Sequence, residues 1–289
     1  MRSSGFAWGA ITVVNALASG KGAALSIDLK VEVDAEVIPD SSAVEVENVG
    51  FPADDVGLVR AVANSVFRRF ELDGYGAKLV IDSPIPVGRG LKSSSAVSNA
   101  VAVSLVSALR RNLEDMEAVG LGVEASLEAG VSVTGALDDA LASYLGGFVV
   151  TDNVGMKMIH RSEVESRLRV VLKVPHRIQY TRDADIEKLR KLATLIDEIH
   201  PLAVAGEIWS SLTLNGLVYA PALGLDSRAI FHAIDAGALA AGVTGSGPAL
   251  AAVCEPTAVE EVRSVWESTE VETWVVGVNN SRCGVSRSE

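Results

Sequence analysis

The sequence contains few aromatic, cysteine and histidine residues. Aromatic residues make up 5% of the 289 positions, so the core must be built mainly from Ala, Val, Leu and Ile. The two cysteines, Cys254 and Cys283, form no CxxC pair, and the four histidines form no zinc-binding pattern. These absences argue against a disulfide scaffold or a zinc protein and favour a reduced, cytoplasmic protein.

Basic residues are also scarce, with 25 Lys and Arg against 37 Asp and Glu and a formal net charge of −12. Because no basic surplus exists to neutralise phosphates, we expect no nucleic-acid and no membrane partner. Asn15, Ser19 and Lys21 interrupt the apolar N-terminal stretch before it reaches the roughly 18 residues of a membrane span. Any phosphate site must instead use a few local cations, a metal ion or backbone N–H groups.

Hydrophobic residues make up 48% of the chain, enough for a large core, and helices and strands are mixed without regular βαβ alternation. This pattern predicts an α+β fold in two lobes, residues 1–160 and 161–289. We expect strands at 5–14, 24–38, 77–82, 148–152, 169–175, 250–255 and 272–278, and a further strand between residue 236 and the glycine turn at 242–249. We expect helices at 55–72 (capped by Asp54 or Asp55), from the serine run to about Leu109, and at 114–128, 184–199, 201–219, 226–236 and 257–268. We also expect a short helix that stops at Gly146 and Gly147.

A glycine-serine loop between a strand and a helix is the sharpest feature of the sequence. It comprises Pro86, Val87, Gly88, Arg89, Gly90, Leu91, Lys92, Ser93, Ser94, Ser95 and Ala96. The glycines allow close backbone approach, and the helix start offers free N–H groups to an anion. The loop fits neither GxxxxGK[ST] nor GxGxxG. A capped helix after a turn is the plainer alternative, but the serine run favours a di- or triphosphate site.

Carboxylates follow this loop at Glu124, Glu128, Asp138 and Asp139. Beside a triphosphate, one carboxylate can hold Mg²⁺ and another can orient or deprotonate an attacking hydroxyl. Alternatively, one of the two aspartates caps the helix that follows, and Glu124 lies on a solvated helix face.

A second glycine-rich turn covers residues 242–249 and contains Gly245, Ser246 and Gly247. Its backbone N–H groups can approach a ligand, although a simple hairpin turn would have the same composition. Asn15 and Lys21, near the N-terminus, are further candidates for contact with a phosphate or an acceptor.

The motif PxGxGLxSSSA resembles the ATP-binding loop of the galactokinase, homoserine kinase, mevalonate kinase and phosphomevalonate kinase (GHMP) superfamily, which normally reads PxxxGLGSSAA. Lys92 replaces the usual small residue. Together with the N-terminal segment around Asn15 and its GKG turn, it makes the sequence similar to the archaeal type of shikimate kinase. The resemblance implies a mixed α/β N-terminal lobe, a ferredoxin-like C-terminal lobe and ATP bound between them.

By this resemblance the loop 86–96 holds the phosphates of ATP, while Ser94 and Glu128 hold Mg²⁺. Asp139 lies eleven residues after Glu128 and seven before Gly146, the family spacing for the aspartate near the acceptor hydroxyl. A register counted from Gly135 selects Asp138 instead. The turn at Gly245, Ser246 and Gly247 would help to close the site.

The implied reaction phosphorylates the 3-hydroxyl of shikimate, on the route to chorismate and the aromatic amino acids. Alternative acceptors are homoserine, mevalonate and pantoate, and a non-catalytic ATP-binding relative is a further possibility. We expect a monomer or a homodimer.

Overall fold

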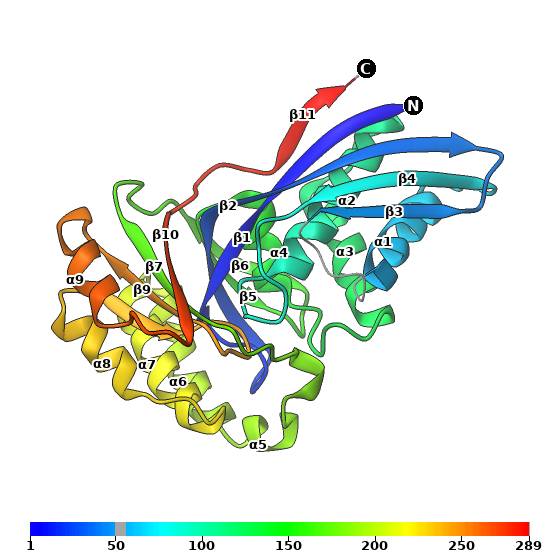
Figure 1. Cartoon of the computed structure of the whole chain (residues 1–289). Coiled ribbons are helices and arrows are strands. Elements are labelled where there is room, and N and C mark those ends of the chain that lie inside the picture. Colours follow the sequence, from blue (N-terminus) through cyan, green and yellow to red (C-terminus); the bar gives the residue numbers. More distant parts are fainter. Residues whose placement is uncertain (50–55, 289) are drawn as a thin grey trace.

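Two β-sheets with helices packed on them form the structure, a computed structural model that describes residues 1–49 and 56–288 (Figure 1). Asp54 and Asp55, the expected helix caps, lie outside the described residues. The first sheet has the order β11-β1-β2-β4-β3, and β5 pairs with β2 and β6. Its strands are β1 (Arg2–Val14), β2 (Lys21–Pro39), β3 (Val44–Val49), β4 (Tyr75–Asp82), β5 (Phe148–Asp152), β6 (Lys157–Ser162) and β11 (Gly284–Ser288).

The second sheet has the order β10-β7-β9-β8. Numbered along the chain, this is the fourth, first, third and second strand, and every pair is antiparallel. Helices follow the first strand and connect the third to the fourth, so this half has the expected ferredoxin-like arrangement. Its strands are β7 (Arg169–Pro175), β8 (Ala240–Val243), β9 (Leu250–Cys254) and β10 (Val271–Gly277).

Helices pack on each sheet. With the first sheet lie α1 (Val56–Arg69), α2 (Ser93–Ala108), α3 (Asp115–Glu128) and α4 (Leu137–Leu145). In the second half of the chain lie η2 (Thr181–Asp183), α5 (Ile186–Arg190), α6 (Ala193–Val204), α7 (Ile208–Ala222), α8 (Arg228–Asp235), η3 (Pro256–Ala258) and α9 (Val259–Ser264). In the described part of the chain, no helix combines the length and the apolar character needed to cross a membrane.

The core is continuous between the two sheets. Ile11 and Leu25 of the first sheet belong to the same buried cluster as Leu172 and Val253 of the second. Small apolar residues fill it, as the low aromatic content requires. A shared core fixes the two halves against each other, so a site formed between them has rigid walls.

Three strands were not expected from the sequence: β3, β6 and β11. β11 also differs in placement, because residues 284–288 pair with β1 in the first sheet although the sequence suggested a second lobe of 161–289. The sheets change between Ser162 and Arg169, and the boundary near residue 160 stays a prediction. The expected helices over 184–199 and 201–219 are three helices with other bounds, because α5 ends at Arg190, α6 runs from Ala193 without a break at residue 200 to Val204, and α7 begins at Ile208.

Candidate active site

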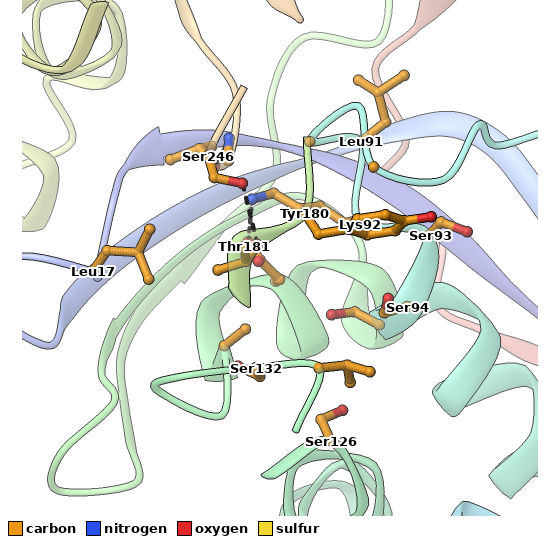
Figure 2. A pocket seen from close by; sticks show the side chains of 18 of the residues that line it. Leu17, Leu91, Lys92, Ser93, Ser94, Ser126, Ser132, Tyr180, Thr181 and Ser246 are labelled. Carbon is orange, nitrogen blue, oxygen red and sulfur yellow. Dashed lines mark hydrogen bonds and ion pairs between the residues drawn. The ribbon is translucent and has the colours of Figure 1, made fainter. Parts of the chain in front are cut away.

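A pocket lies where the two halves of the chain meet, and most of the residues selected from the sequence line it. They are Pro86, Val87, Gly88, Gly90, Leu91, Lys92, Ser93, Ser94, Ser95, Asp138, Asp139, Gly245 and Ser246. Figure 2 shows Ser93 and Ser94 at the start of one helix, with Thr181 and Ser246 reaching the same space from the second half of the chain. Arg89, Ala96, Gly247 and Glu128 do not line the pocket.

The loop before α2 makes two close backbone approaches. Gly88 and Gly90 both have positive φ, +66° and +84°. A Cβ on Gly90 would lie 2.1 Å from the carbonyl oxygen of Thr244, and one on Gly88 would lie 2.5 Å from Ile178. Only glycine meets both requirements at these positions, so the loop is pressed against the second half of the chain.

The N-terminus of α2 opens into the pocket without a cap. Lys92, the residue before the helix, has φ 65° and no side-chain cap bond. The hydroxyl oxygen of Ser93 is buried and has no hydrogen-bond partner among the described residues. Free amide groups, a positive helix end and an unpartnered hydroxyl together form an anion site.

The C-terminal glycine turn is hydrogen-bonded to both the loop and β1. The hydroxyl of Thr244 donates to the Gly90 carbonyl at 2.7 Å, and the amide of Gly245 donates to the Thr12 hydroxyl at 2.8 Å. The side-chain amide of Asn15 donates to the Gly245 carbonyl at 2.7 Å. The turn therefore acts as a wall of the pocket, and Asn15, one of the N-terminal candidates, lines it.

Lys92 and Asp139 form an ion pair across the pocket, with 3.1 Å between Nζ and Oδ1. The two side chains are only 8% and 13% exposed. Burial raises the pKa of Asp139 to about 7, while Lys92 acts in the opposite direction. A carboxylate with such a pKa can accept a proton at neutral pH and release it again.

Asp138 occupies the same pocket with different partners. Its Oδ1 accepts a hydrogen bond from the Asn153 side-chain amide at 2.9 Å, and the Thr151 hydroxyl donates to the side-chain oxygen Oδ1 of Asn153 at 2.6 Å. Both aspartates lie in the first turn of α4, where the helix dipole favours negative charge. The side-chain amide of Asn99 donates to the Ala140 carbonyl at 2.9 Å and thereby fixes α4 against α2.

Glu128 requires a correction, because the structure turns it away from the pocket. Its carboxylate is more than half exposed and pairs with Arg68 at 3.1 Å. Glu124 is exposed as well, whereas Ser126, between them, is buried and lines the pocket. Residues two apart lie on nearly opposite helix faces, so the outward face of α3 carries both glutamates. Of the expected metal pair Ser94 and Glu128, only Ser94 reaches the site.

Several lining residues were missed from the sequence. Ser126, Ser132 and Thr134 precede the two aspartates, and their small polar side chains could have been noticed there. Three further lining residues follow β7 and carry no motif: Gln179, Tyr180 and Thr181. Only the fold brings them to the loop, where the backbone amide of Gln179 donates a hydrogen bond to the Gly88 carbonyl at 2.9 Å. Lys21 does not line the pocket and pairs with Asp197 at 2.9 Å.

Comparisons with known proteins show relatives over both halves of the chain. Residues 57–147 match the model of the GHMP kinases N terminal domain, and residues 205–272 match that of the GHMP kinases C terminal. A shikimate kinase from Methanosarcina mazei is 38% identical over 95% of this chain and 94% of its own length. A shikimate kinase from Pyrococcus furiosus is 41% identical over 91% of this chain and 95% of its own length.

Solved structures share the fold at low sequence identity. The homoserine kinase from Cytophaga hutchinsonii aligns with a TM-score of 0.77 at 20% identity, covering 98% of this chain and 97% of its own. A mevalonate kinase from L. major in complex with R-mevalonate aligns with a TM-score of 0.74 at 14% identity, covering 96% of each chain. These likenesses support the two-lobed architecture.

Proposed function

Because the chain belongs to the GHMP kinase family, we propose that it transfers the terminal phosphoryl group of ATP to the 3-hydroxyl of shikimate. The product is shikimate 3-phosphate, an intermediate on the route to the aromatic amino acids. The observation that carries the proposal is the buried Lys92–Asp139 pair, which faces an uncapped helix N-terminus in one pocket. The choice of shikimate as the acceptor rests on the relatives named shikimate kinase, which are 35–41% identical to this chain.

The phosphates of ATP fit the start of α2. The amide groups of Ser93, Ser94 and Ser95 have no side-chain cap, and Lys92 adds a cation at the same place. The unpartnered Ser93 hydroxyl is a further donor to a phosphate oxygen. This site uses one lysine and backbone dipoles, which is how an acidic protein can bind a polyanion.

The donor set on this side of the pocket also fits Mg²⁺, which prefers hydroxyl, carboxylate, phosphate and water oxygens. Ser94, which lines the pocket, would hold the ion together with the phosphates. In the described residues no group of three His, Cys, Asp or Glu side chains could hold a metal alone. When bound, Mg²⁺ neutralises charge on the phosphates.

In this proposal Asp139 acts on the acceptor, and its pair with Lys92 beside the start of α2 supports that role. The hydroxyl oxygen attacks the terminal phosphorus, the bond from that phosphorus to the bridging oxygen breaks, and ADP leaves. The hydroxyl proton passes to the Asp139 carboxylate, and Lys92 offsets negative charge beside it. Catalysis rests mainly on positioning and on charge stabilisation, as phosphoryl transfer requires.

We assign the reaction to the cytoplasm, which agrees with the two cysteines, both buried and free of disulfides.

The test is a coupled ADP-release assay with Mg-ATP against shikimate, homoserine, mevalonate and pantoate in parallel. We expect ADP release with shikimate alone. Release with another acceptor and none with shikimate would reject the proposed acceptor but keep the kinase chemistry. If protein that calorimetry shows to bind ATP releases no ADP with any of the four acceptors, the proposed reaction is rejected.

A further inference from the structure

Asp138 and Asp139 are adjacent in the chain and line one pocket, but residues of different segments hold them. The partner of Asp139 is Lys92, which belongs to the phosphate-binding loop. The partner of Asp138 is Asn153, which follows β5. Asp139 therefore lies on the side of the phosphates, and Asp138 lies beyond it, against the first sheet.

Asp138 has one oxygen fixed and one available. Asn153 donates to Oδ1, and its own amide orientation is set because the Thr151 hydroxyl donates to its carbonyl oxygen. The backbone amide of Asn153 donates to the Gly20 carbonyl at 2.8 Å, which anchors the residue to the first sheet. Among the described residues the hydrogen bond from Asn153 to Oδ1 is the only one that the Asp138 carboxylate makes, and the side chain lines the pocket.

Gly22 on β2 makes room for this carboxylate. A Cβ there would lie 2.6 Å from Cγ of Asp138 and 2.7 Å from Oδ2. Gly22 has no positive φ, so a glycine is needed here because it leaves room for the carboxylate, and not because of its backbone conformation. The carboxylate thus packs against the backbone of Gly22, which has no side chain, and Asn153 holds it in one orientation.

We propose that Asp138 Oδ2 accepts a hydrogen bond from a second hydroxyl of the acceptor, on the carbon next to the one that is phosphorylated. This inference rests on the proposed function and makes the site selective for vicinal diols. A hydroxyl bound to a buried carboxylate forms a strong, charge-assisted hydrogen bond. An acceptor without that hydroxyl leaves the carboxylate buried and unpaired. The loss of this hydrogen bond weakens binding more than the loss of a methylene group from the acceptor would.

The test is a double-mutant cycle between residue and substrate. The parent protein and Asp138→Ala are each assayed with shikimate and with 4-deoxyshikimate, at saturating Mg-ATP. For the parent, we expect loss of the 4-hydroxyl to lower kcat/KM by about tenfold to a hundredfold, mainly through KM. For Asp138→Ala, we expect a similar loss with shikimate, and no more than about a twofold further loss with the deoxy acceptor.

The outcomes separate this inference from the proposed function. If the parent does not phosphorylate shikimate, the proposed function fails. If the parent uses both acceptors equally well, or if Asp138→Ala still loses about tenfold or more with the deoxy acceptor, the Asp138 assignment fails while the kinase activity stands.

A second variant tests the same point without removing the carboxylate. Gly22→Ala displaces Asp138 by steric contact, and we expect an increase of about tenfold in KM for shikimate, with the Kd for ATP unchanged. Gly155→Ala is the matched control, since its Cβ would also lie 2.7 Å from an aspartate oxygen, that of Asp152, on an exposed turn. Equal shikimate KM values in the two variants would overturn the proposal.

Discussion

The backbone conformation of Lys92 is strained and determines how the phosphate-binding loop meets α2. A non-glycine residue at φ 65° is strained by about 1 kcal/mol or more. The strain is compensated by what the conformation achieves, because it ends the loop, starts α2 and directs Nζ to Asp139. In the sequence Lys92 stood out as a departure from a motif, but its partner could not be identified, because the pair is 47 positions apart and depends on how α4 packs.

Asp139→Asn should lower kcat by two or more orders of magnitude while ATP still binds. The amide cannot take the hydroxyl proton, but it keeps the shape of the side chain beside Lys92. Steady-state kinetics with shikimate and calorimetry with ATP measure the two effects. Near-normal turnover in this variant, together with an inactive Asp138→Asn, would exchange the roles proposed for the two aspartates.

Lys92→Met should move the acidic limb of the kcat/KM profile to higher pH. Asp139 must be ionised to accept a proton, so activity rises as pH passes through its pKa of about 7. The lysine holds that pKa down, and its removal should shift the limb upward by about one pH unit. Lys92→Arg keeps the charge and serves as the control. The titration of ATP is common to all proteins compared, so an identical limb in Lys92→Met would contradict the coupling.

At the scale of elements, two helix N-termini meet at the pocket, those of α2 and α4. Each is preceded by a non-glycine residue with positive φ, Lys92 and Ala136, and neither has a side-chain cap. The sequence predicted both helices and the glycine-serine loop, because glycine, serine and apolar spacing are local signals. It did not predict that α3 turns Glu128 outward, because Glu128 was selected by its distance along the chain from Asp139 and not by the apolar face of the helix.

The contact between the loop and the turn 244–249 should be sensitive to a single methyl group. Gly90→Ala places a Cβ 2.1 Å from the Thr244 carbonyl at φ +84°, so we expect a loss of several kcal/mol in unfolding free energy or a weaker Kd for ATP by about tenfold or more. Gly224→Ala is the control, because it has φ +70° and nothing within 4 Å. Denaturant unfolding and ATP titration would contradict this expectation if the two variants behaved alike.

Strands were predicted less completely than helices. β3 and β6 are short outer segments, and half-exposed strands of charged and apolar residues give little contrast with loops. Residues 179–181 carry no motif at all and join the site only because β7 ends beside the loop. Such contacts depend on the topology of the whole chain, so a short stretch of sequence carries no signal for them.

At the scale of the whole molecule, the site costs stability. The ordinary pKa of an aspartate is 3.8, and burial raises that of Asp139 to about 7. Between these values the folded state binds more protons than the unfolded chain. The contribution of Asp139 is therefore favourable at low pH and is lost as pH rises through 7. A buried acid kept for chemistry thus weakens the fold at neutral pH.

Asp139→Asn should consequently gain stability relative to the parent as pH rises. The amide does not titrate, so the difference in unfolding free energy between variant and parent should move in favour of the variant from pH 4 to pH 8. Urea unfolding at a series of pH values measures it. A difference that stays constant over this range would show that Asp139 has the same proton affinity in the folded and unfolded chains.

The pairing of β11 with β1 bears on how the protein is made. Ser3 pairs with Ser288 and Phe6 with Gly284, so the outer edge of β1 is covered by residues that leave the ribosome some 280 positions later. Until then β1 presents unpaired N–H and C=O groups, a template for pairing with other chains. Nascent chains stalled before residue 284 should therefore be the species most dependent on chaperones, although their nucleotide pocket is already encoded in full.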